Sequence, residues 1–130
     1  MIVLDASAVV EILTNGPFAE SFQHDMGNGA GSFIAPHLLD IEVISALRRI
    51  AAAGRLNAER TELALTRFAK LPAERYPHTP LLHRVWELRH NFTAYDAIYI
   101  ALAEETDSVL CTTDAKLRTG HRARVRVLAV

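Results

Sequence analysis

The chain has 130 residues with 14 Lys and Arg against 15 Asp and Glu, and half of its residues are hydrophobic. This composition predicts one globular domain over residues 1–130, and the near-neutral charge excludes a wholly cationic nucleic-acid-binding surface. The single cysteine, Cys111, excludes a disulfide framework and a multi-cysteine metal site. No apolar span approaches the ~20 residues of a transmembrane helix, and the N-terminus lacks a basic signal-peptide start. We therefore expect a cytoplasmic domain without membrane association.

Apolar runs and helix-ending residues organise the first half of the chain. Ser7 can cap a helix that Asn15-Gly16-Pro17 ends, and Pro36 can open a long helix that Gly54 closes. The elements predicted here are a strand at 2–4, a helix from 7 to the stop at 15–17, a short helix at 18–26, a flexible loop at 27–31, a strand at 32–35 and a helix at about 37–53.

The second half continues the alternation of helices and strands. Asn57 can cap a helix, prolines punctuate residues 72–80 without a predicted element, and Thr93 begins a very apolar helix. The elements predicted here are helices at 57–71, 81–88 and 93–103, a strand at 108–112, a turn capped by Asp114 and a strand at 125–130. Strands separated by helices predict an α/β domain of three layers, α/β/α, with a central and mostly parallel sheet.

Two aspartates follow predicted strands. Asp5 ends the first strand, and Asp114 comes directly after the strand at 108–112. In an open α/β sheet, ligands bind in the crevice at the carboxyl ends of the strands, which makes both residues candidates for a site. Helix capping is the alternative, because a carboxylate there meets free N–H groups and the positive end of the helix dipole.

Three further acids lie on predicted helices. Asp96 is the only charge in residues 94–103, where an unpaired carboxylate is costly, although Thr93-x-x-Asp96 also matches a capping box. Glu42 falls about 40° beyond the apolar stripe of its helix, a rim position that can reach into a crevice. Asp40 projects near the middle of that stripe but lies in the first turn, where acids are common. Of the two, Glu42 is better placed to be a ligand.

Three aspartates and one glutamate from four separate segments can converge in one crevice. Carboxylates a few ångströms apart repel one another, and a hard divalent cation with oxygen ligands, Mg²⁺ or Mn²⁺, removes that cost. Such an ion activates water and stabilises the charge that develops in phosphoryl displacement. Because no nucleophilic Ser/His pair is visible, these acids indicate metal-assisted phosphodiester hydrolysis.

Four segments carry a family resemblance: IVLDASA at 2–8, EV at 42–43 with ALRR at 46–49, YDA at 95–97 followed by Ala101, and TTD at 112–114. In this order they resemble the PIN domain, and most closely its VapC-type toxins from bacterial toxin–antitoxin pairs. The resemblance implies an endoribonuclease that uses Mg²⁺ or Mn²⁺, a homodimer, and inhibition by a small VapB-type antitoxin. It also implies a catalytic, metal-binding cluster of Asp5, Glu42, Asp96 and Asp114, supported by the hydroxyls of Ser7 and Thr112. We include Asp40 as a further supporting residue.

A cationic segment follows Asp114. Lys116, Arg118 and Arg122 can hold RNA phosphates beside the acids, and a solvated edge that contacts the antitoxin is the alternative. Two other functions remain open: a catalytically silent PIN-like binding module and a receiver-type signalling domain. The receiver interpretation requires a lysine at a late strand end, and the chain has only Lys70 and Lys116.

Overall fold

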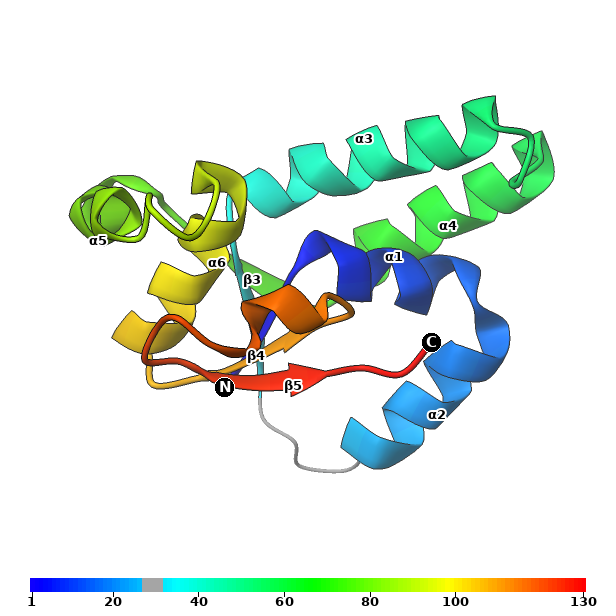
Figure 1. Cartoon of the computed structure of the whole chain (residues 1–130). Coiled ribbons are helices and arrows are strands. Elements are labelled where there is room, and N and C mark those ends of the chain that lie inside the picture. Colours follow the sequence, from blue (N-terminus) through cyan, green and yellow to red (C-terminus); the bar gives the residue numbers. More distant parts are fainter. Residues whose placement is uncertain (27–31) are drawn as a thin grey trace.

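The computed structural model describes residues 1–26 and 32–130 and contains a five-stranded sheet in the order β3-β2-β1-β4-β5 (Figure 1). The strands are β1 (Ile2–Leu4), β2 (Phe33–Pro36), β3 (Ala73–Tyr76), β4 (Val109–Thr112) and β5 (Arg124–Val127). Each of the four strand pairings is parallel, which confirms the predicted sheet. The loop predicted at 27–31 lies outside the described residues.

Helices cover both faces of this sheet. They are α1 (Ala6–Thr14), α2 (Gly16–Met26), α3 (Leu38–Ala52), α4 (Ala58–Lys70), α5 (Leu82–Glu87) and α6 (Ala94–Glu105), with short 3₁₀ turns η1 (Thr79–Leu81) and η2 (Ala115–Arg118). Helix α1 contacts α2, α3 and α4, whereas α6 packs against β1, β2 and β4 and carries α5 (Figure 1). The three-layer prediction is confirmed. No helix within residues 1–26 and 32–130 is long and apolar enough to cross a membrane.

The core explains the two most apolar segments of the sequence. Strand β1 lies in the middle of the sheet, and all three of its residues are buried. Residues 97–103 of α6 are also buried, so this helix has no wide polar face. A central parallel strand and a helix enclosed by its neighbours both need apolar residues at almost every position.

Strand β3 was not predicted. It pairs in parallel with β2 and forms one edge of the sheet; Glu74 is exposed, and its other three residues are partly buried. An edge strand meets solvent on one side, so β3 can carry the two charges of its sequence, AERY, and can lie between prolines. Strand β5 at the other edge is shorter than predicted and begins at Arg124.

The strand order creates a crevice at one end of β1. Strand β2 lies on one side of β1 and β4 on the other, so the connections that leave the sheet reverse direction between β1 and β4. Ligands bind at such a switch point, beyond the carboxyl ends of the strands. Asp5 and Asp114 follow the two strands that border it.

Candidate acidic active site

Asp5 joins β1 to α1. Its backbone is extended, and its Oδ1 accepts hydrogen bonds from the Ala8 N–H at 3.0 Å and from the Ser7 hydroxyl at 2.6 Å. The cap of α1 is therefore Asp5, and the prediction of Ser7 as the cap is wrong. The chain turns into the helix at the end of β1, which places Ser7 inside the first turn with its hydroxyl directed to the carboxylate.

Two hydroxyls connect the ends of β1 and β4. The Oγ atom of Ser7 lies 3.4 Å from Oγ1 of Thr112 and accepts the N–H of Thr113 at 3.0 Å. Thr112, which is fully buried, accepts the N–H of Asp114 on its hydroxyl at 3.0 Å. These contacts hold Asp5 and Asp114 at the same edge of the sheet.

Asp114 and Asp96 both begin helical turns. Oδ1 of Asp114 accepts the N–H of Lys116 at 2.9 Å, and the hydroxyl of Thr93 accepts the N–H of Asp96 at 3.2 Å. The capping interpretation is therefore correct for Asp114, and Thr93 caps α6 as predicted. Capping accounts for where these turns begin, but it does not account for the repulsion among the carboxylates described below.

Glu42 reaches the same region from the second turn of α3. It is half-buried, and its Oε1 accepts a hydrogen bond of 2.7 Å from the hydroxyl of Tyr99 on α6. Burial raises the pKa of Glu42, the bond from Tyr99 opposes that rise, and the negative charges of Asp96 and Asp5 add to it. The rim position predicted for Glu42 thus brings it to the other acids.

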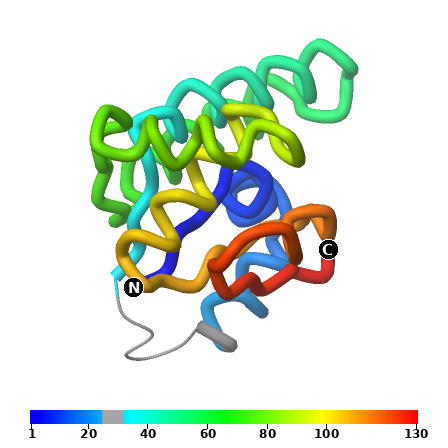
Figure 2. Tube along the Cα trace, turned by 60° about the vertical axis from the view of Figure 1, so that its left-hand side comes forward, coloured from blue at the N-terminus to red at the C-terminus, as the bar shows by residue number. Residues whose placement is uncertain are grey.

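The four acids form one electrostatic unit, which we call the acidic centre: Asp5, Glu42, Asp96 and Asp114. Burial raises the pKa of Asp5, and the negative charge of Asp114 raises it further. Hydrogen bonds from Ser7, Thr112 and the Ala8 N–H lower the pKa, but they do not cancel the rise. Burial also raises the pKa of Asp96, to which the charges of Asp114 and Asp5 contribute. Figure 2 shows the yellow start of α6 near the blue start of α1. Each member therefore repels at least one other member.

The donor set fits a hard divalent cation. All four groups offer carboxylate oxygens, which Mg²⁺ and Mn²⁺ prefer, and a cation removes the repulsion among them. Among the side chains that the structure describes, at residues 1–24 and 32–130, no three His, Cys, Asp or Glu residues are grouped so that they could hold a metal ion. The chemistry of the centre therefore supports a metal site, while its coordination is not formed in this conformation.

The remaining predicted site residues divide into two groups. Lys116 lies at the acidic centre, where its charge lowers the pKa of Asp96 against the stronger effect of burial, and Arg118 is exposed in the same turn. Asp40 instead forms an ion pair of 2.8 Å with Arg75 on β3. Arg122 lies at the other end of α6, where its backbone N–H donates to Glu104 at 2.8 Å.

A cleft opens beside the acidic centre, between α1 and α3. Its volume is about 340 Å³, and its walls include Ser7, Glu42, Ser45, Arg49 and Thr113. The charge of Arg49 lowers the pKa of Glu42 against the effect of burial, so a cation lies near the carboxylates on this side. Of the acidic centre and its hydroxyls, the cleft is lined by Glu42 and Ser7.

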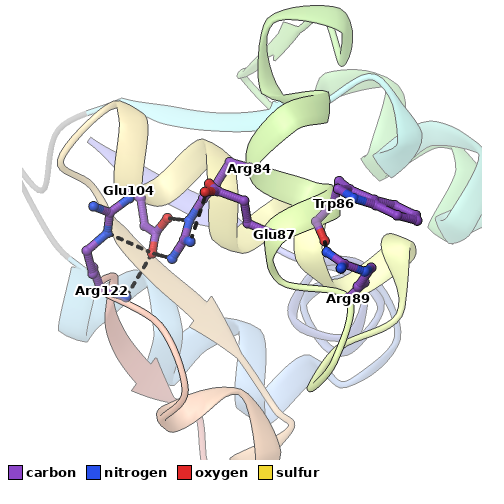
Figure 3. Close-up of polar contacts among 6 residues, drawn as sticks. All are labelled: Arg84, Trp86, Glu87, Arg89, Glu104 and Arg122. Carbon is purple, nitrogen blue, oxygen red and sulfur yellow. Dashed lines mark hydrogen bonds and ion pairs between the residues drawn. The ribbon is translucent and has the colours of Figure 1, made fainter.

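A larger cavity, of about 440 Å³, lies at the carboxyl-terminal end of α6, away from Asp96. Arg84 donates to Glu104 at 2.6 and 3.0 Å, and Arg122 approaches the same carboxylate at 3.7 Å (Figure 3). These ion pairs join α5, α6 and the segment before β5. Their cationic and anionic groups are matched, so we assign this cavity a structural role.

Comparison with known proteins identifies the family. A family model of the PIN domain matches residues 2–120. The chain belongs to the PIN domain family. The match spans all four members of the acidic centre and confirms the resemblance drawn from the sequence.

Curated relatives cover the full length of this PIN domain. VapC ribonuclease Mb0985 of Mycobacterium bovis and Ribonuclease VapC9 of Mycobacterium tuberculosis are each 39% identical over 130 residues, which is 100% of this chain and 98% of the relative. Ribonuclease VapC12 of Mycobacterium tuberculosis is 33% identical over 132 residues, covering 99% of this chain and 100% of the relative. Among solved structures, PAE2754 from Pyrobaculum aerophilum has a TM-score of 0.70 at 22% identity, covering 95% of this chain and 86% of that one. This likeness supports the fold.

Sequence reasoning did not single out Tyr99 as a site residue of the PIN domain. Tyr99 was counted with the apolar residues of its helix, although a buried phenol needs a hydrogen-bond partner and so carried a usable signal. Arg49 belongs to the ALRR segment at 46–49 that carries the family resemblance, and only the position of α3 beside α1 shows that it lines the cleft.

Proposed function

We propose that this PIN domain is an endoribonuclease toxin that hydrolyses RNA phosphodiester bonds at the acidic centre with a bound Mg²⁺ or Mn²⁺. One observation carries the proposal: four carboxylates from separate segments lie at the switch point of the sheet, and negative charges within this group add to the raised pKa of Asp5, Glu42 and Asp96. The names of the relatives, which are ribonucleases, supply the substrate class.

The residues of the centre have separable tasks. Asp5, Glu42, Asp96 and Asp114 would hold the cation, which when bound supplies an activated water and stabilises the charge that develops on the phosphate. Ser7 and Thr112 orient Asp5 and can position a water molecule. Lys116 and Arg118, beside Asp114, are suited to bind RNA phosphates. Arg122 and Asp40 have ion-pair partners elsewhere, and their roles at the site stay predictions.

The test is cleavage of total RNA with mapping of the new ends, in Mg²⁺ and in excess chelator. Asp114→Asn keeps a side chain that caps η2 and removes one negative charge, and we expect cleavage to fall by about 100-fold or more. The matched control is Asp107→Asn: Asp107 has φ of 50° and lies in a turn at the other end of α6, where Asn is tolerated.

Four results would contradict the proposal. Cleavage that persists in chelator would exclude the metal mechanism, and a wild-type rate for Asp114→Asn would show that Asp114 acts only as a cap. RNA that is bound but never cut would favour the catalytically silent binding module. Equal losses for Asp107→Asn and Asp114→Asn would show that the loss does not arise at the acidic centre.

We also propose a homodimer and a complex with a small VapB-type antitoxin, in keeping with the VapC names of the relatives. Phe22, Leu81 and Leu88 are buried in the core and are therefore not available to a dimer interface. Leu82 and Trp86 on α5 remain exposed, at 54% and 64%. Exposed large apolar side chains of this kind are typical of association surfaces.

A further inference from the structure

Tyr99 connects the two helices that carry Glu42 and Asp96. It lies one turn after Asp96 in α6, and its side chain is 2% exposed. Its hydroxyl donates to Oε1 of Glu42 at 2.7 Å, across 57 residues of sequence. This contact joins Glu42, through a buried phenol, to the helix that carries Asp96.

The direction of this hydrogen bond follows from the charges. An ionised carboxylate can only accept, so the phenol donates, and burial together with the Glu42 charge raises the pKa of Tyr99 and keeps its proton in place. Asp5 and Asp114 accept from backbone N–H groups of their own turns. Glu42, by contrast, is held by a side chain from another helix.

Glu42 needs such an anchor more than the aspartates do. Its side chain has three rotatable bonds, and the charges of Asp96 and Asp5 act against its ionised form at the centre. Without the bond from Tyr99, the side chain would gain both entropy and solvation by turning toward the open cleft that it lines. The bond occupies one oxygen and leaves the other for a ligand.

We propose that Tyr99 is a positioning residue that holds Glu42 at the acidic centre, so that loss of its hydroxyl weakens the binding of a divalent cation. The inference rests on the proposed metal-dependent function and names a further residue on which that function depends. Partners that orient a metal ligand commonly account for about 10- to 100-fold in metal affinity.

The experiment measures Mn²⁺ binding to the whole chain without RNA, by electron paramagnetic resonance of the free ion. Tyr99→Phe removes one oxygen and keeps the ring, and we expect the Mn²⁺ affinity to fall about tenfold or more. Tyr76→Phe is the matched control, because Tyr76 is partly buried against the core but lies in the edge strand β3. The Mn²⁺ affinity of Tyr76→Phe should equal that of the wild type.

The outcomes separate the two proposals. If wild type and Tyr99→Phe bind Mn²⁺ equally while Tyr99→Phe melts lower, Tyr99 has only a structural role and the inference is overturned. If the wild type binds no Mn²⁺, both the inference and the metal-dependent function fail.

A second variant covers the case in which Tyr99→Phe does not fold. Glu42→Asp keeps the charge and the whole Tyr99 ring but draws the carboxylate back by one methylene, out of reach of the hydroxyl. We expect a comparable loss of Mn²⁺ affinity. Wild-type affinity in Glu42→Asp would overturn the inference, because the position that Tyr99 imposes would then not matter.

Discussion

Replacing Asp5 with Asn separates its role as a helix cap from its role as a charge. The Asn side-chain oxygen can still accept from the Ala8 N–H and the Ser7 hydroxyl, and Asn caps helices as well as Asp does. The substitution removes only the negative charge of a residue that is 6% exposed. Helix capping alone therefore predicts little change in stability or in RNA cleavage.

The structure predicts a different result. Hydrogen bonds to a charged acceptor are stronger than neutral ones by about 1 kcal/mol each, so two weakened bonds cost about 2 kcal/mol. Removing a buried charge returns several kcal/mol of desolvation, together with the repulsion from Asp114. The raised pKa of Asp5 shows that burial and repulsion outweigh the hydrogen bonds. We expect Asp5→Asn without metal to be more stable at pH 7 by about 1 kcal/mol, or about 4 °C in Tm.

The gain should depend on pH with a definite sign. Because the folded pKa of Asp5 is raised, the wild type loses stability as pH rises through that value. The advantage of Asp5→Asn should therefore grow as pH rises above the unfolded pKa and disappear below about pH 4, where the carboxyl is protonated in both the folded and unfolded states.

Thermal denaturation in chelator and in Mg²⁺ measures these effects. A bound ion stabilises the wild type by RT ln(1 + [L]/Kd), about 2.7 kcal/mol at 100 times Kd, and Asp5→Asn should lose most of this gain. The order of stability should thus reverse between chelator and Mg²⁺. A variant that is less stable by 1 kcal/mol or more in chelator at pH 7, or that cleaves RNA normally, would refute the reasoning.

Two further predictions concern other parts of the molecule. Arg84→Ala should destabilise the fold by about 2 kcal/mol at pH 7, because it removes the nearer cation from Glu104, whose side chain is 7% exposed. Burial raises the pKa of Glu104, but the hydrogen bonds and charges of Arg84 and Arg122 together lower it below its usual value. The stability lost in Arg84→Ala should therefore shrink as pH falls below about 4, as measured by urea denaturation. Leu82→Asp should shift sedimentation at micromolar concentration toward the monomer, whereas Leu63→Asp, at a site of similar exposure on another helix, should not. A monomeric wild type would contradict the dimer.

The sequence by itself determined the α/β architecture and singled out four acids as candidates for a site. Apolar strands, helix caps such as Asn57 and Thr93, and the isolated charge of Asp96 are local signals, and the structure agrees with each of them. The edge strand β3 had no such signal, because its stability comes from pairing with β2 and not from its own residues. Ser7 was mistaken for a cap because the end of β1, and not the residues of the helix, sets where α1 begins.

Only the tertiary structure decided which of the candidate residues share a site. The order of the strands brings the ends of β1 and β4 together, and α6 crosses them so that Asp96 joins Asp5 and Asp114. The tertiary structure also separates Arg122 and Asp40 from that centre, because both form ion pairs elsewhere. The contact between Tyr99 and Glu42 spans 57 residues, and no local pattern encodes such a pairing. Residue types and spacing specify chemistry along the chain, whereas distances between segments depend on how the helices pack on the sheet.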